Sequence, residues 1–578
     1  MNDPSIPSFN LLDDPWIPCL ALAPDGSVRR EELGLQTLLE RAHEITELTS
    51  PSPLITISLY RLLLALIHRV YGPADKDAWW GLWDAKKADM AKLNAYLDTV
   101  RPRFNLFDTE RPFYQDAAIS EEYAGSIAKL TPEQASSGNK VLLFDHGQGA
   151  AVGGLTPAAA ARYLVAFQSY AIRGLISRET EADKSASDGP LVKGAVLLVR
   201  GETLWQTLLL NLVQYPREQR SRDTNKPDPL AWERSAGRET TGLARLPDGY
   251  LDYLTWQSRR VRLFPDREAD GTIVVRRVAA LKGHPFAAGF ERKSQETMMA
   301  FAQNKQSKEN QDPYFPLAFN EERALWRDST TIFVTQPGKA WRPQALQWLD
   351  DLKVRKKLSL TALPLDALGM RPHLKEATIL AWHHERLALP LAYLDENNKA
   401  LFEKLGLALD LSEGAGRAVH NSTRELATLL IAPNAVNKKD KTVRQPLPAD
   451  VNGLAQSLGI ERIFWAALDE PFTHFLLDLP KGLVDDDPDG EHFDDYARTQ
   501  LDIWADTLYN TSRMALRTVT DGLDSSARAL KAAALGERAR RSFVAKALKP
   551  YGCHSGASVA SQTPIDTQLT PTGMATAV

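Results

Sequence analysis

A glycine-rich stretch near residue 150 has the residue types that cradle phosphate groups. It reads Gly147-Gln148-Gly149-Ala150-Ala151-Val152-Gly153-Gly154 and lies between an expected strand over residues 140–144 and an expected helix over residues 157–170. This is the setting of a dinucleotide-binding turn, but Val152 occupies the place of the third glycine, and no strand that ends in an acidic residue follows about twenty positions later. Three interpretations stay open: a dinucleotide site, a structural loop and, as the favoured one, a contact between backbone amides and nucleic-acid phosphates.

An acidic run matches the first half of a calcium-binding loop. It reads Asp485-Asp486-Asp487-Pro488-Asp489-Gly490, but Tyr496 stands where such a loop needs a bidentate glutamate. The proline inside the run weakens the match further. A solvated acidic connection at the start of a helix explains the run better.

Two adjacent histidines suggest a metal or acid–base site in Trp382-His383-His384-Glu385-Arg386. On the helix expected here, neighbouring residues point about 100° apart, so His383 and His384 are poorly placed to share one ion. The chain also has no Gly-x-Ser-x-Gly motif and no Walker loop. We therefore expect no enzyme activity, no catalytic residue, no metal site and no cofactor. The alternative is a nucleotide-dependent enzyme that uses the glycine-rich loop after Phe144.

Basic residues gather in four groups, for which a solvated charged face is the ordinary explanation. The last group falls between two expected helices near the C-terminus, and a basic loop in that position can hold phosphates without reading bases. The groups, in chain order, are Arg217, Arg220, Arg222 and Lys226; Arg259, Arg260 and Arg262; Arg276 and Arg277; and Lys438, Lys439, Lys441 and Arg444.

The bulk composition is that of a folded protein with no broad basic surface. A chain of 578 residues is too long to fold around one hydrophobic core. Of these residues 43% are hydrophobic, and the formal net charge is -4. Any contact with nucleic acid must therefore be local. Cys19 and Cys553 are the two cysteines, which form no disulfide framework and suit a reducing cytoplasm. The longest apolar run, residues 54–70, contains Arg61 and His68 and is expected to be a buried helix rather than a membrane span.

The periodicity of apolar residues predicts a mixed N-terminal part. Residues 33–97 should be mainly helical, and residues 9–12 should form a short buried strand. Residues 177–189 should form an exposed polar loop. The further expected elements are strands over 140–144, 195–199 and 272–275 and helices over 157–170 and 203–215.

From residue 377 the pattern becomes helical, which favours a separate antiparallel bundle. We therefore expect an α+β protein with a mixed domain over residues 1–375, a helical bundle over 376–552 and a disordered tail over 553–578. The expected helices cover residues 377–389, 417–431, 455–479, 493–523 and 525–548.

Several short motifs occur in an order that resembles the CasA family, the large subunits of the type I-E CRISPR surveillance complex Cascade. The chain opens on Phe9-Asn10-Leu11-Leu12-Asp13-Asp14-Pro15-Trp16-Ile17-Pro18, an apolar run that ends with a tryptophan between two prolines. The resemblance extends over residues 8–550. Its other motifs are residues 103–107, 111–115, 143–149, 194–201 followed by 204–211, and 377–380 followed by 382–386.

The resemblance implies a noncatalytic recognition subunit whose C-terminal domain is a four-helix bundle. Such a subunit reads the protospacer-adjacent motif (PAM) in double-stranded DNA, helps to open the duplex for R-loop formation and helps to recruit a helicase-nuclease, while the guide RNA reads the target. The implied partners are the crRNA, double-stranded target DNA, the helicase-nuclease and the other Cascade subunits, namely the backbone, small, handle-binding and RNA-processing subunits. No membrane is implied.

The same resemblance suggests four sets of working residues. The loop Phe144, Asp145, His146, Gly147, Gln148 and Gly149 matches the family loop that engages the guide RNA handle and neighbouring subunits. Residues 177–184 replace a glycine-dense PAM reader, so Arg178 or Lys184 would supply the contact, together with a lysine of the middle region, Lys282 or Lys293. The duplex-splitting wedge falls on His373, Leu374, Lys375 and Glu376. Nonspecific DNA binding falls on Lys438, Lys439, Lys441 and Arg444.

Overall fold

The chain folds into two compact units with different architectures. The mixed unit comprises Met1–Gly406 and Phe472–Leu483, and the helical unit comprises Leu407–Pro471 and Val484–Val578. The expected α+β class with a helical C-terminal part is confirmed. The structure, a computed structural model, describes residues 7–131, 154–176, 185–214, 228–234, 243–307, 311–320, 323–373, 379–433, 445–484, 490–549 and 551.

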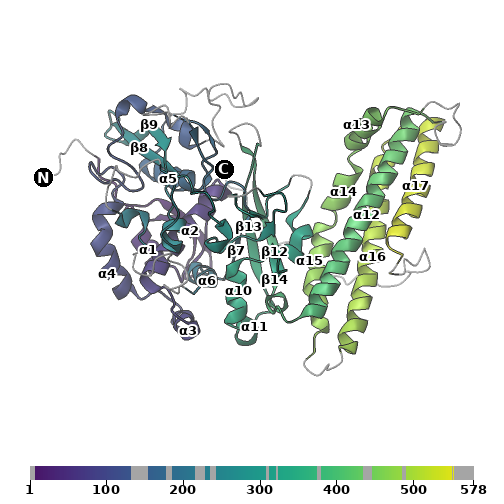
Figure 1. Ribbon diagram of the computed structural model, residues 1–578, viewed down its shortest axis with the longest axis horizontal. Helices are drawn as coiled ribbons and strands as arrows, with labels where there is room; N and C mark the ends of the chain where they lie inside the picture. The colour runs from purple at the N-terminus through teal and green to yellow at the C-terminus, as the bar shows by residue number, and fades with distance from the viewer. Residues whose placement is uncertain are drawn as a thin grey trace. The chain divides into compact units, whose positions relative to one another are not determined.

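Helix α2 (Pro53–Tyr71) forms the centre of the mixed unit, where Figure 1 shows it among α1, α5 and α6. Ser52 caps its first turn by accepting a hydrogen bond from Leu54 N, and a proline occupies the first helical position. It packs against other helices and against the long hairpin of the unit. Of the described helices, α2 has the length and composition to cross a membrane, but 78% of its apolar window is buried inside the protein, as in a core helix. The buried helix expected here is confirmed.

The opening segment corrects one expectation, because residues 9–12 do not form a strand. Asn10 makes an isolated bridge with Asn105, and the chain then turns. Side chains close this turn: Asn10 Oδ1 accepts from Leu12 N at 3.0 Å, and Asp14 Oδ2 accepts from Asn10 N at 2.6 Å. Leu12 is nevertheless fully buried. The apolar run therefore fills the core from a turn, and the first strand begins only at Ile17.

The described strands of the mixed unit form small antiparallel sheets. The first has the order β2-β1-β3, the second β4-β9-β8, the third β11-β10-β12 and the fourth β14-β13-β7, and β5 pairs with β6 alone. The strands are β1 (Ile17–Leu22), β2 (Val28–Leu33), β3 (Ile45–Leu48), β4 (Gly125–Ser126), β5 (Gly174–Leu175), β6 (Ser185–Ala186), β7 (Val196–Val199), β8 (Arg259–Arg267), β9 (Ile273–Lys282), β10 (Phe301–Gln303), β11 (Tyr314–Pro316), β12 (Ala340–Trp341), β13 (Ala362–Pro372) and β14 (Ile379–Pro390).

The helices of the mixed unit agree in part with the sequence pattern. Helix α5 has the bounds that we expected, with Thr156 as its cap. The expected strand over 195–199 and helix over 203–215 are shorter, and the strand over 272–275 is longer. The helices are α1 (Leu35–Glu40), α3 (Lys76–Asp84), α4 (Met90–Val100), α5 (Pro157–Tyr170), α6 (Leu204–Leu210), α8 (Tyr250–Leu254), α9 (Ser329–Phe333), α10 (Gln344–Asp351) and α11 (Val354–Lys357), with 3-10 turns η1 (Arg101–Phe104), η2 (Glu121–Tyr123), η3 (Ile127–Leu130), η5 (Ala231–Glu233), η7 (Arg292–Ser294), η8 (Leu325–Asp328), η9 (Leu391–Leu394) and η10 (Leu479–Gly482).

The prediction of a helix over residues 377–389 is wrong, because Ile379–Pro390 form strand β14. Exposure alternates from residue to residue along it, which is the period of a strand. His383 and His384 therefore point to opposite faces. His383 stacks on Phe319 with ring centroids 4.6 Å apart, and His384 Nε2 lies 3.4 Å from Asp366 Oδ2. Because β14 pairs with β13, the mixed unit extends past the boundary that we expected at residue 376.

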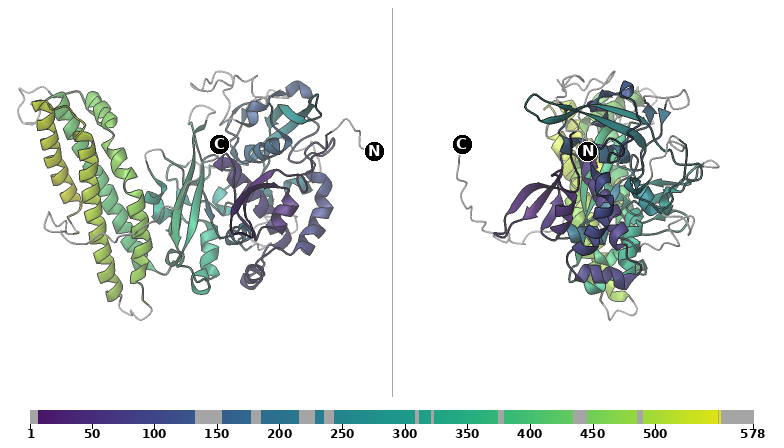
Figure 2. Two further views of the ribbon diagram at one scale, coloured as in Figure 1. Left: turned by 180° about the vertical axis from the view of Figure 1, so that it is seen from behind. Right: turned by 90° about the vertical axis from the view of Figure 1, so that its left-hand side faces the viewer.

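The helical unit contains a four-helix bundle whose long helices run side by side in Figures 1 and 2. Helices α13 and α14 together form one of the four columns, joined at Gly459, whose φ of 67° is left-handed. Trp504 Nε1 of α16 donates to Ala408 O of α12 at 3.1 Å, and Arg540 Nη1 of α17 donates to Ser512 Oγ of α16 at 2.9 Å. The described helices of this unit are α12 (Lys399–Ile431), which enters it at Leu407, α13 (Pro448–Leu458), α14 (Ile460–Ala466), α16 (Glu491–Thr520) and α17 (Ala527–Ala547). Most of α15 (Asp469–Asp478) belongs to the mixed unit, which includes Phe472–Leu483.

Three expectations fall outside the described residues. They are the strand over 140–144, the acidic connection over 485–489 and the tail over 553–578.

Candidate nucleic-acid interface

Most of the site residues predicted from the sequence lie outside the described part of the chain. Those that are described are Lys282, Lys293 and His373. The remainder are Phe144, Asp145, His146, Gly147, Gln148, Gly149, Arg178, Lys184, Leu374, Lys375, Glu376, Lys438, Lys439, Lys441 and Arg444. The structure therefore describes the segments on either side of the predicted site residues rather than most of those residues themselves.

The base of the loop over residues 177–184 is held by one buried arginine. The strands on its two sides, β5 and β6, pair with each other. Arg259 Nη2 donates to Ile172 O at 2.8 Å before the loop, and Arg259 Nη1 donates to Ser187 O at 2.8 Å after it. Burial lowers the pKa of Arg259 to about 10, so its guanidinium is still charged at neutral pH. A single side chain thus joins the two ends of the loop.

The surroundings of Arg259 fix this arrangement to helix α5 and strand β9. Gln168 of α5 accepts from Arg259 N at 3.0 Å and donates to Arg259 O at 2.9 Å. At Gly189, a side chain would place its Cβ 2.6 Å from Ser169 O, so the chain after β6 lies too close to α5 for any larger residue. β6 also packs against β9. The ends of the loop are therefore rigidly placed.

The wedge predicted at residues 373–376 falls at the tip of the β13–β14 hairpin. The two strands pair from Ala362↔Pro390 to Pro372↔Ile379, and a bulge between Arg371 and Pro372 interrupts the register next to the tip. Such a bulge bends and twists a hairpin locally. His373 is the last described residue before the tip. The long hairpin is visible near the centre of the left-hand view in Figure 2.

A buried carboxylate braces the stem of this hairpin. Asp366 of β13 accepts from Arg200 Nη1 at 2.9 Å and from Arg386 Nε at 2.7 Å, and Arg200 also pairs with Glu47 of β3 at 2.8 Å. Burial disfavours the charge of Asp366, but hydrogen bonds from His384 and Arg386 and the charge of Arg200 outweigh it and hold the pKa of Asp366 well below its usual range. The cluster joins β3, β7, β13 and β14.

An apolar groove of about 680 Å³ lies beside the hairpin tip. Its basic members are Lys193, Arg371 and His373, and none of its described lining residues is acidic. Lys193 Nζ is 2.9 Å from Asp188 Oδ2, and Asp188 accepts from Arg173 N at 2.8 Å, so Lys193 connects the groove with the base of the loop over 177–184. The lining residues are Lys193, Phe315, Pro316, Ala318, Phe319, Met370, Arg371, Pro372, His373 and Leu380.

The two lysines predicted for the middle region have different surroundings. Lys282 ends β9 and pairs in register with Arg259, next to the loop base. Lys293 Nζ instead lies over two rings, 4.0 Å from the centroid of Tyr314 and 3.9 Å from that of Trp341. The structure thus brings Lys282, and not the ammonium of Lys293, to the base of the loop.

The arginine groups of β8 and β9 form contacts inside the protein. Arg260 pairs with Asp116 at 2.8 Å, Arg262 Nη1 donates to Ile119 O at 2.7 Å, and Arg277 pairs with Glu121 and Asp266. Sequence reasoning treated Arg259 as one of a surface group and missed its structural position. The alternation along β8, with Arg259 and Val261 buried, is the signal that could have separated it from its neighbours.

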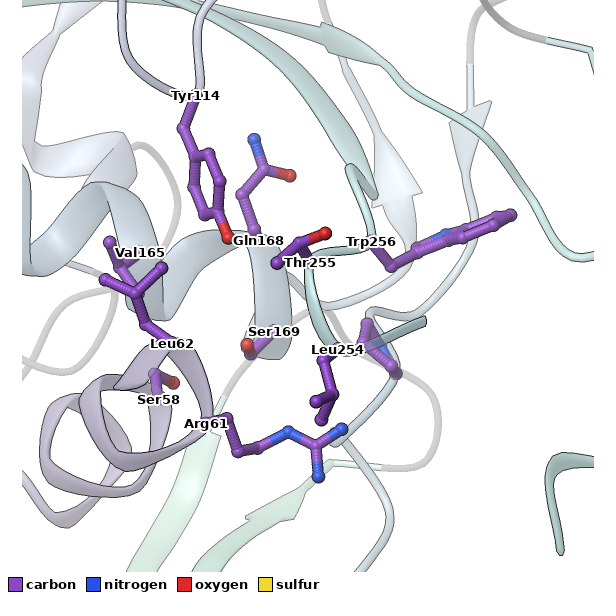
Figure 3. A pocket seen from close by; sticks show the side chains of 11 residues that line it. Ser58, Arg61, Leu62, Tyr114, Val165, Gln168, Ser169, Leu254, Thr255 and Trp256 are labelled. Carbon is purple, nitrogen blue, oxygen red and sulfur yellow. The ribbon is translucent and has the colours of Figure 1, made fainter. Parts of the chain in front are cut away.

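A second cavity lies inside the mixed unit between α2, α5 and α8 (Figure 3). Its volume is about 10 Å³, the space of one water molecule. Arg61 at its edge forms a buried pair with Glu296 at 2.9 Å, and Ser58 and Gln168 also line it. It is too small for a nucleotide, so it offers no site for the nucleotide-dependent activity considered from the sequence. Within the described residues, no three His, Cys, Asp or Glu side chains gather as a metal site would require.

Comparison with known proteins gives one consistent family. The family model for CRISPR-associated protein Cse1 matches residues 10–515. A CRISPR-associated protein CasA/Cse1 from Thermus thermophilus is 32% identical over 550 residues, which cover 92% of this chain and 97% of the relative. The crystal structure of Thermus thermophilus CasA superposes with a TM-score of 0.73 at 28% identity, covering 93% of this chain and all of that one. A chain of a CRISPR RNA-guided surveillance complex shares the fold, with a TM-score of 0.69 at 20% identity over 93% of this chain and 99% of its own length.

Proposed function

The chain belongs to the CRISPR-associated Cse1 (CasA) family, and on that premise we propose that it is the noncatalytic large subunit of a type I-E Cascade complex in the cytoplasm. In this proposal it assembles with a crRNA and the other Cascade subunits, reads the PAM in double-stranded DNA and helps to open the duplex beside it. It also binds DNA nonspecifically and helps to recruit the helicase-nuclease. In this division of roles the protein recognises the short PAM, and base pairing of the guide RNA recognises the target sequence.

The observation that carries the proposal is the shared position of two elements that the sequence separates widely. Residues next to the tip of the β13–β14 hairpin line the groove, and Lys193, which also lines it, pairs with Asp188 at the base of the loop over 177–184. A protein that reads a motif and splits the next base pair needs its reader and its wedge within one or two base pairs of each other. The link through Lys193 supports such a proximity.

We assign the individual roles on the same basis. Arg178, Lys184 and Lys282 would contact the PAM, because Lys282 lies beside the loop base, whereas the ammonium of Lys293 is already held by two rings. The wedge would comprise His373, Leu374, Lys375 and Glu376. The loop Phe144–Gly149 would bind the guide RNA handle, and Lys438, Lys439, Lys441 and Arg444 would bind DNA of any sequence.

The test is co-expression with the genomic neighbours, followed by sequencing of any bound RNA. We expect a complex that contains RNA of nearly uniform length and binds duplex DNA only when it carries both the target and the motif. The double variant Leu374→Ala with Lys375→Ala should assemble normally and bind the motif, but it should lose permanganate reactivity of thymines beside the motif. A chain that purifies alone and without RNA from such cells would contradict the assignment to Cascade.

A control separates the wedge from general DNA binding. Lys438→Ala should weaken binding to all duplexes alike and leave opening of the bound fraction unchanged. If that variant instead lost opening selectively, or if the wedge variant opened DNA normally, the roles that we assign to these residues would be wrong.

A further inference from the structure

We propose that the groove beside the hairpin tip is a binding site for one unstacked nucleotide, which it takes from the first base pair opened next to the motif. The base would lie among the apolar side chains, and its phosphate would lie at the basic rim. This inference rests on the proposed function, because it assigns a ligand to the groove between the proposed reader and the proposed wedge. It adds a capture step to the opening of the duplex.

The apolar lining fits a base. Phe315 on β11 is 48% exposed and Leu380 on β14 is 47% exposed, although both are large apolar side chains on the same groove. The volume of about 680 Å³ lies within the range of sites that hold small organic ligands. Every nucleobase has a flat π-face that stacks on an exposed aromatic ring without requiring a particular sequence. Phe315 is the ring available for this contact.

The charge at the rim distinguishes a nucleotide from an apolar peptide. Lys193 is 47% exposed, and its contact with Asp188 keeps its ammonium at the mouth of the groove. Arg371 contributes its guanidinium from the hairpin, and Asp188, the carboxylate that pairs with Lys193, is not one of the described lining residues. A phosphodiester linked to the stacked base meets this arrangement of an apolar floor with a cationic edge.

The floor of the groove is rigid. A Cβ added at Gly369 would lie 2.7 Å from Gly194 O and 3.0 Å from the ring of Phe319, and one added at Gly194 would lie 2.4 Å from Met299 Sδ. β13 and the segment before β7 are therefore in direct contact behind the groove. A preformed site binds a base without first reorganising, which favours trapping of a transiently open pair.

A double-mutant cycle in the assembled RNA-guided complex tests the stacking contact between Phe315 and the unstacked base. One change is Phe315→Ala, and the other replaces single nucleotides beside the motif, on either strand, by an abasic site. Loss of a base–aromatic stack corresponds to a decrease of about 5-fold to about 150-fold in the equilibrium for opening. At one position, we expect each change alone to cause such a loss and the two together to cause no further loss. Losses that multiply at every position would overturn the proposal.

Two variants guard against misfolding as the explanation. Phe315→Tyr keeps a ring and should retain opening, and Phe543→Ala removes a similarly exposed phenylalanine, 37% exposed on α17, and should change nothing. Photo-crosslinking of duplexes that carry 5-iodouracil beside the motif should label Phe315 or His373. Labelling elsewhere, or Phe315→Ala complexes that lose a protein subunit before any DNA is added, would overturn the proposal in favour of another ligand.

The outcome also separates this proposal from the one on which it rests. If the wild-type complex neither contains RNA nor opens motif-bearing duplexes, the proposed function fails. If it opens them and Phe315→Ala opens them equally well, only the nucleotide site fails.

Discussion

The base of the loop over residues 177–184 and the stem of the β13–β14 hairpin are both braced by a buried charge, but of opposite sign. At the loop base, the cation Arg259 is satisfied by backbone carbonyls of Ile172 and Ser187. In the hairpin stem, the anion Asp366 is satisfied by Arg200, Arg386 and His384. Both charges are buried, and neither Arg259 nor Asp366 is among the described residues that line the groove.

The difference shows how a recognition surface can be made rigid without losing its positive charge. The carbonyl partners of Arg259 neutralise no charge, and the carboxylate at the loop base, Asp188, pairs with Lys193 at 2.9 Å. The hairpin stem needs its carboxylate to hold several strands together, and there it is covered by cationic side chains, of which Arg386 is more than half exposed. At the hairpin stem, Arg386 is the more exposed partner of the buried carboxylate, which suits a polyanionic ligand.

The largest effect should come from removing the buried anion. Asp366→Asn leaves Arg200 and Arg386 without their shared carboxylate, and breaking a buried pair in this way costs about 3 kcal/mol or more of the free energy of unfolding. Because the cluster joins β3, β7, β13 and β14, we expect the loss in chemical denaturation of the purified chain. Opening of the duplex should weaken as well, since the hairpin stem loosens.

The matched control is the same change at an exposed aspartate. Asp98, on α4, lies 3.6 Å from Arg101 Nη2 with its side chain 69% exposed. Asp98→Asn should alter the free energy of unfolding by less than about 1 kcal/mol. Equal losses at the two positions would mean that the stem does not depend on a buried charge.

A smaller effect on stability, but a more specific one on recognition, should follow from Arg259→Met. The change leaves the carbonyls of Ile172 and Ser187 without their donor, which costs about 1–3 kcal/mol. Because the ends of the motif-reading loop are no longer joined, we expect the ratio of affinities for duplexes with and without the motif to fall. Affinity for duplexes without the motif should stay the same.

Arg262→Met is the control for this positioning role. Arg262 is on the same strand and also donates to a carbonyl, that of Ile119. It should therefore lose a comparable amount of stability and keep its motif preference. A change of preference in both variants would assign the effect to general loosening of β8 rather than to the loop base.

The sequence predicted the fold class and the family but not these braces. Helix α5 was predictable to the residue because Pro157 and its Thr156 cap act locally. The strand β14 was mistaken for a helix because its apolar and polar residues fit either period over so short a stretch, and pairing with β13, a contact between distant residues, decided the outcome. Arg259 was likewise indistinguishable from its arginine neighbours until β8 placed its side chain inward.

The groove could not be predicted at all, for a similar reason. Lys193, Phe315 and Leu380 are far apart in sequence, and each alone is an ordinary residue near the end of a strand or in a turn. Only the close packing at Gly194 and Gly369 brings their segments together. The roles of residues 144–149, 178, 184, 374–376 and 438–444 stay predictions, since these residues lie outside the described part of the chain.

The two braces are predicted to differ in their response to acid, because only Asp366 titrates in the acid range. The pKa of Asp366 is lower in the folded chain than the usual value of about 3.9, so its contribution to stability is complete above that pH and is lost as the pH falls toward the folded-state pKa. Arg259 stays charged throughout this range. Below about pH 4, a single carboxylate that takes up a proton on unfolding lowers the free energy of unfolding by at most about 1.4 kcal/mol per pH unit.

Denaturation of the wild type and of Asp366→Asn between pH 7 and pH 3 isolates the contribution of Asp366 to the free energy of unfolding, because the other carboxylates titrate in both proteins. The stability difference between the two should be constant above about pH 5 and should shrink below about pH 4. For wild type and Arg259→Met, the difference should not change over the same range. If the first difference stayed constant in acid, or the second shrank with it, charge would not be what separates the hairpin stem from the loop base.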